Sequence, residues 1–154
     1  MRNYGVILLL LIIYISQNIY SQDIDTLALN SNILKAKLSI KDGEYSKSRD
    51  YAREALKIDP GFGEAYIIIG VAYVSSIEIC KDEPVPNMIY CLAVDMFEKA
   101  LEVDSTMNIK AKKFIEVYSN YFPNRETTWH LPREGDKYKI GCWINEETTV
   151  RYSD

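Results

Sequence analysis

The chain has 154 residues, of which 47% are hydrophobic and 26% are charged, which is typical of one folded domain and excludes an intrinsically disordered chain. The formal net charge is -4, and the lysines and arginines are interleaved with acidic residues. Because no basic face is visible for a phosphate backbone, nucleic acid is excluded as the expected partner.

Residues 1–21 have the profile of a secretory signal peptide. Arg2 gives a positive start, Val6 to Ile15 is a nearly unbroken apolar run, and the chain then turns polar. The run is about half of the ~20 apolar residues that a membrane-spanning helix needs, so an uncleaved anchor is the less favoured alternative. Cleavage before Gln22 predicts a periplasmic or secreted protein with no membrane span.

Three cysteines would then lie in an oxidising compartment, where disulfides form. Cys80 and Cys91 bracket an expected loop and are the candidate pair, with Cys142 left over. Spacing alone does not show that two sulfur atoms meet. The alternative is that all three are small buried hydrophobes or free thiols.

Residues 29–62 predict a pair of antiparallel helices. Gly43 suits the left-handed conformation that ends a helix, and Pro60 cannot continue one. Small residues at the expected crossing let two helix axes approach to ~8–10 Å. These small residues are Ala36, Ser39, Ser48, Ala52 and Ala55.

Residues 63–107 predict a second pair with an insert. The first helix of this pair carries Ala65, Tyr66, Ile69, Gly70 and Tyr73, and the second carries Ala93, Phe97 and Ala100. The insert near 77–88 contains Pro84 and Pro86, so it must loop out of the helix. Long loops inside a compact unit are often functional.

A capping helix is expected over 107–121. Ala111, Phe114 and Tyr118 recur at intervals of about one turn, which places them on one face against the preceding pair. A terminal helix of this kind covers apolar surface that the last pair would otherwise expose.

The C-terminal segment, 124–154, has a period of two. Every second residue from 138 to 144 belongs to one set, which is Tyr138, Ile140, Cys142 and Ile144. Asn145 to Glu147 interrupt this alternation, and β-favouring residues resume at Thr148. This pattern predicts a β-hairpin. A lone hairpin is marginally stable, so we expect it to pack on the helices with Trp129 and Trp143 as anchors.

The two helix pairs and the ending Gly135 to Glu146 resemble exported tetratricopeptide repeat (TPR) proteins of Bacteroidetes-type bacteria. The resemblance implies a mainly all-α fold: a TPR-like α-α superhelix of two helical hairpins over residues 22–123, with the capping helix and the C-terminal β-hairpin. It also implies a protein or peptide as the partner, with no enzymatic activity.

The resemblance also places a binding surface on the concave groove. The groove positions of this chain are then Asn30, Ile33, Lys37, Glu64, Ile67, Val71, Ile109, Lys112 and Glu116. Exposed Ile67 and Val71 between Lys37 and Lys112 would suit an extended peptide with apolar side chains and a carboxylate. The alternative is that Ile67 and Val71 pack under the hairpin.

No motif indicates a catalytic, cofactor or metal site. His130 is the only histidine, and phosphate loops, Cys-x-x-Cys pairs and nucleophile elbows do not occur. A thiol enzyme that pairs Cys91 or Cys142 with His130 is the enzymatic alternative. A self-assembling envelope subunit that makes contacts through the insert and the hairpin edge is the structural alternative.

Overall fold

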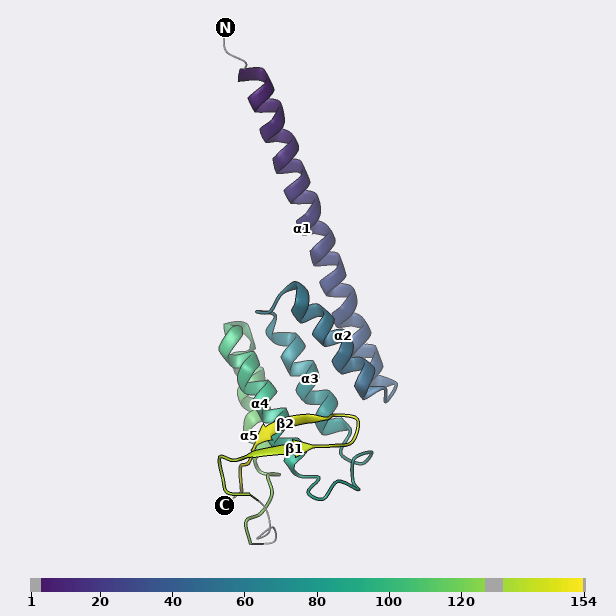
Figure 1. The fold of residues 1–154 in the computed structure, drawn as a ribbon, viewed down its shortest axis with the longest axis vertical. Coiled ribbons are helices and arrows are strands. Elements are labelled where there is room, and N and C mark those ends of the chain that lie inside the picture. The colour runs from purple at the N-terminus through teal and green to yellow at the C-terminus, as the bar shows by residue number, and fades with distance from the viewer. Residues whose placement is uncertain (1–3, 127–131, 154) are drawn as a thin grey trace.

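The computed structural model describes residues 4–126 and 132–153, with side chains for residues 14–15, 22–126 and 132–153. The elements are α1 (Tyr4–Lys41), α2 (Tyr45–Ile58), α3 (Gly63–Ser75), α4 (Met88–Val103), a 3-10 turn (Ser105–Met107), α5 (Asn108–Ser119), β1 (Lys137–Ile140) and β2 (Glu146–Thr149). The described chain is therefore mainly helical with a two-stranded antiparallel sheet near its C-terminus, as predicted (Figure 1).

Consecutive helices run in alternating directions and pack as neighbours, α1 on α2, α2 on α3, α3 on α4 and α4 on α5 (Figure 1). Apart from the start of α1, their bounds agree closely with the helix pairs expected over 29–62 and 63–107 and with the capping helix expected over 107–121. Gly43 has a φ of 75°, so it makes the predicted turn between α1 and α2. None of the helices in the described ranges combines the length and apolar content that a bilayer crossing requires.

Small residues allow these helices to approach closely. The alanines at the expected crossings have no exposed surface: Ala36, Ala52, Ala55, Ala65, Ala93 and Ala100. At Gly70 a Cβ atom would lie 2.4 Å from the Phe97 ring, so only glycine fits between α3 and α4 there. The core of the molecule lies between α3 and its neighbours.

The first helix starts far earlier than the repeat pattern predicts. It is continuous from Tyr4, so no break separates residues 4–21 from the repeat region at Gln22. Leu29 and Ile33 are buried against the body, whereas the N-terminal half stands away from it (Figure 1). The helix continues past the body because nothing in Gln22–Ala28 stops it.

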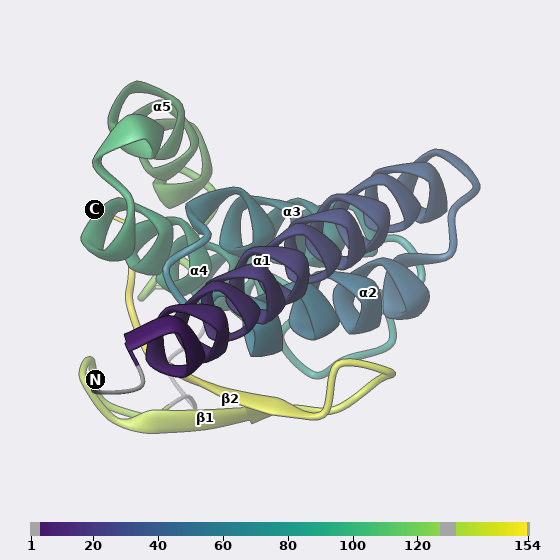
Figure 2. The ribbon, with the colours of Figure 1, turned by 90° about the horizontal axis from the view of Figure 1, so that it is seen from above.

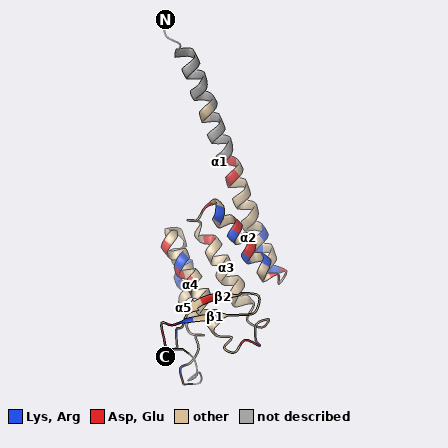
Figure 3. Cartoon of the chain, viewed as in Figure 1, with Lys and Arg blue, Asp and Glu red and all other residues tan. Residues whose placement is uncertain are grey.

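Charge is segregated along α1. Its acidic residues, Asp23 and Asp25, precede the part that packs on the body, and its basic residues, Lys35, Lys37 and Lys41, follow (Figure 3). Over residues 22–41, α1 is therefore negative at its N-terminal end and positive at its C-terminal end.

The hairpin packs on α4 and on the ends of the neighbouring helices. In the register of the sheet, Lys137 lies opposite Thr149 and Ile140 lies opposite Glu146. We predicted that the first strand would reach Ile144 and that Glu146 would interrupt the pattern, and both expectations are wrong. Cys142 and Asn145 have positive φ angles of 49° and 51°, so residues 141–145 form the turn instead.

The insert between α3 and α4 holds this turn. A disulfide joins Cys80 of the insert to Cys142, and the Gly141 N–H donates a hydrogen bond to Glu83 at 3.2 Å. The predicted Cys80–Cys91 pairing is therefore wrong. Cys91 belongs to the first turns of α4 and is buried beneath the C-terminal segment, where it is a free thiol.

Candidate functional site

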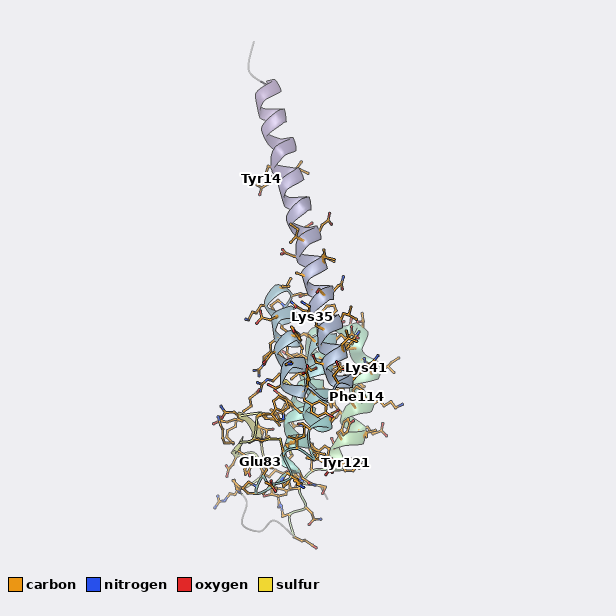
Figure 4. The ribbon with its side chains drawn as sticks, turned by 90° about the vertical axis from the view of Figure 1, so that its right-hand side faces the viewer. Tyr14, Lys35, Lys41, Glu83, Phe114 and Tyr121 are labelled. Atoms are coloured by element: carbon orange, nitrogen blue, oxygen red, sulfur yellow. A yellow bond between two sulfur atoms is a disulfide. The ribbon has the colours of Figure 1, made fainter. Side chains whose placement is uncertain are left out.

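A groove with a volume of about 390 Å³ lies between α1, α3 and α5. Its floor is apolar and comes from α3, and its walls come from the flanking helices. The lining residues are Leu34, Lys37, Leu38, Ile40 and Lys41 of α1, Glu64, Ile67, Ile68 and Val71 of α3, and Lys110 and Phe114 of α5. Lys41 and Phe114 mark its two walls in Figure 4.

The groove has more positive than negative charge. Its carboxylate, Glu64, lies 2.9 Å from Lys37 and 3.9 Å from Lys110. Within the described ranges, Lys41 has no acidic partner. Three lysines against one glutamate leave the rim cationic, so a ligand with carboxylates would be attracted there.

Lys37, Ile67 and Val71 lie in the groove as predicted, although the exposure that we expected for Ile67 is wrong. Ile67 is only 1% exposed because it is part of the core, and Val71 is half-buried. Their apolar atoms form the floor. Of the other expected positions, Glu64 lines the groove, whereas Asn30 and Ile33 do not.

Lys112 and Glu116 do not line the groove, which corrects the prediction. Each is two residues from Phe114, and at 100° per residue two positions correspond to 200° around a helix. Since Phe114 faces the groove and the Phe97 ring, Lys112 and Glu116 face away and are exposed. Ile109 is also fully on the outside, at 88% exposed.

The hairpin does not cover the groove. Seen from above, the hairpin lies along one side of the helices and α5 lies on the other (Figure 2). The groove lining contains no residue of the C-terminal segment. The alternative that Ile67 and Val71 pack under the hairpin is therefore wrong.

The hairpin is held on its own side by two polar clusters. In the first, the Glu146 carboxylate accepts a hydrogen bond from the Tyr73 hydroxyl at 2.7 Å and pairs with Arg49 at 3.2 Å and Arg53 at 2.5 Å. Burial and the bond to Glu146 raise the pKa of Tyr73 above its usual range. The Arg49 guanidinium also lies 4.9 Å from the Trp143 ring, so this predicted anchor contacts the helices.

In the second cluster, Asp95 of α4 accepts a hydrogen bond from Thr148 at 2.7 Å and forms an ion pair with Arg151. Arg151 also pairs with Glu98 at 2.8 Å. Burial raises the pKa of Asp95, while Thr148 and Arg151 oppose that rise. Both clusters satisfy buried polar groups with partners inside the chain, so they serve stability.

The two thiol candidates are not available as nucleophiles in this arrangement. Cys142 is in the disulfide. Burial raises the pKa of the Cys91 thiol to about 12, so the reactive thiolate is scarce at neutral pH. His130 and the predicted anchor Trp129 lie outside the described residues.

Our sequence analysis missed seven of the groove residues, which are Leu34, Leu38, Ile40, Lys41, Ile68, Lys110 and Phe114. A signal for the α1 residues was present: a second apolar stripe, Ile24, Leu27, Leu34 and Leu38, runs beside the buried stripe of the same helix. One apolar stripe suffices to bury a helix, so a second stripe indicates a second surface. Comparison of the chain with known protein families and with curated proteins finds no match in either.

Proposed function

We propose that this chain is an exported, non-enzymatic interaction module of the TPR type that binds a partner protein in the groove between α1, α3 and α5. The groove carries the proposal. It combines an apolar floor with a cationic rim, and nothing in the described chain covers it. Uncovered apolar surface of this kind is typical of protein interaction sites.

The binding mode follows from the lining residues. Apolar contact with Val71 and Phe114 would supply most of the binding energy, and the lysines would set the register of an acidic partner. Glu64 already neutralises part of the charge of Lys37 and Lys110, so Lys41 offers the least compensated cation. The expected ligand is therefore a segment with apolar side chains and carboxylates on one face.

Two observations support the rest of the proposal. The helices alternate in direction and bury alanines at their crossings, and this arrangement supports the TPR type that we propose. The Cys80–Cys142 disulfide is favoured in an oxidising compartment such as the periplasm or the exterior of the cell, which agrees with the signal-peptide profile of residues 1–21.

Selection from a phage-displayed library of random peptides on the full chain tests the groove. We expect recovered peptides to combine Leu, Ile, Val or Phe with Asp or Glu. A Lys110→Glu variant should lose them, because it reverses a charge on the rim. The matched control is Lys112→Glu, which makes the same change on the outer face of α5. Equal recovery with both variants contradicts the proposal.

A further inference from the structure

The second apolar stripe of α1 has the spacing of a helix-pairing surface. Ile24, Leu27, Leu34 and Leu38 are 49%, 72%, 59% and 47% exposed. They follow one another at steps of 3, 7 and 4 residues, which is the spacing of the a and d positions of a heptad. Ser31 occupies the one a position in this run that is not apolar. Two of the four, Leu34 and Leu38, also line the groove. The stripe therefore runs from the groove along the free part of the helix.

The flanking charges of this stripe are self-complementary only in an antiparallel arrangement. Asp23, Asn30 and Lys37 occupy the same heptad position beside the stripe, at steps of seven residues. When two copies of α1 pair antiparallel about Asn30, Asp23 of each copy lies beside Lys37 of the other. In a parallel pair, position g lies beside position e of the partner, so Asp23 would lie beside Ala28 and would not meet Lys37. The helix dipoles also favour the antiparallel arrangement.

The segment Gln22–Ala28 has the chemistry that the groove requires. Its exposed side chains include Ile24 and Leu27, which are apolar, and Asp23, which is acidic. It is already helical and extends beyond the body, so binding would cost little ordering of the segment (Figure 1).

We propose that the groove binds the free part of α1 from a second copy of this chain, in a two-fold symmetric antiparallel helix pair. This inference rests on the groove of the proposed function and names its occupant. Residues 22–38 of each copy form the contact, a length of about 25 Å at 1.5 Å per residue. Because the contact is two-fold symmetric, both grooves are filled at once and assembly stops at the dimer.

Charge reversal tests the arrangement directly. Four full-length chains are compared by sedimentation equilibrium in a non-ionic detergent that masks the apolar run Val6–Ile15: the natural chain, Asp23→Lys, Lys37→Asp and the double variant. Each single change should weaken dimerisation about tenfold, since it places like charges together at two sites of the dimer. The double variant should restore dimerisation. Asp25→Lys is the matched control, because Asp25 lies about 200° around the helix from Asp23.

The rescue separates pairing from misfolding, because the double variant carries both changes and loses the Lys37–Glu64 ion pair as well. A natural chain that stays monomeric, or four chains with equal association, overturns the inference. If the peptide selection still depends on Lys110 in that case, the proposed function stands and the occupant is another protein. If the selection fails as well, the groove itself is not a binding site.

Discussion

The two sides of the helical body differ in whether their charged side chains have partners within the chain and whether their apolar side chains are buried. On the hairpin side, Glu146 and Asp95 find cationic partners within the chain, and a disulfide fixes the turn. On the groove side, one glutamate pairs with two of the three lysines, and apolar side chains remain exposed. The comparison indicates that the hairpin side provides stability and that the groove side is left open for a partner.

The largest expected effect is chemical protection of Cys91 beneath the C-terminal segment. The pKa of this thiol rises from its ordinary 9.0 to about 12 through burial, so at pH 8 the folded protein should react with iodoacetamide about a thousandfold more slowly than the unfolded chain. Mass spectrometry of the Cys91 peptide measures this ratio. Rapid labelling of the folded chain would revive the thiol-enzyme alternative.

The same pKa gives a pH dependence with a defined sign. Below pH 9 the thiol is protonated in both the folded and the unfolded chain. Between pH 9 and about pH 12 only the unfolded chain loses the proton, so the contribution of Cys91 to the free energy of unfolding falls as pH rises through this window. In a Cys91→Ala variant this component of the pH dependence should disappear from the unfolding curves.

Removal of the disulfide should be the largest mutational effect on stability. The bond joins residues 62 positions apart, and Cys142→Ser should lower the free energy of unfolding by about 4 kcal/mol on the chain-entropy estimate. Calorimetry should give the same lowered melting temperature for the reduced natural chain. Reductant should have no further effect on the variant. Peptide binding in the groove should survive, because the groove lies on the other side of the body.

A smaller loss should follow Glu146→Gln. This change removes the charge that Arg49 and Arg53 share and weakens the bond from Tyr73, so we expect a loss of about 2 kcal/mol. Urea denaturation checks this value. Glu147→Gln, on the exposed next position of the same strand, is the control and should change stability very little. Equal losses in both variants would mean that the cluster does not hold the hairpin.

The smallest effect on stability should come from the groove side. Leu38→Ser should change the free energy of unfolding by only about 0.5 kcal/mol or less, because the side chain is half exposed. The same change should weaken both peptide capture and dimerisation. A large loss of stability with unchanged binding would reverse the roles that we assign to the two sides.

The helices were predictable from sequence because each has local signals. Gly43 and Pro60 end helices, and Pro84 and Pro86 force the insert out of the helical region. The hairpin was predictable from the alternation of Tyr138 and Ile140. Its turn was not, because the left-handed conformations of Cys142 and Asn145 depend on the contacts that the turn makes.

Two of the misses, the disulfide pairing and the facing of α5, have a physical cause in tertiary contacts between elements. The disulfide partner of Cys80 is fixed by the docking of the hairpin on the insert, and spacing along the sequence carries no information on that docking. Likewise, Lys112 and Glu116 were placed by repeat spacing, whereas the contact of Phe114 with Phe97 sets the rotation of α5. Lys37, Ile67 and Val71 were found because they lie on helices whose facing the repeat pattern does fix.

The Cys80–Cys142 bond also determines how the molecule would respond to mechanical load. It closes a covalent ring that contains α4, α5 and β1, so stretching the chain from its ends cannot unravel those elements. The disulfide thereby shortens the length to which the chain can be stretched by roughly 200 Å. The wall that α5 contributes to the groove stays tethered even where shear peels α1 away.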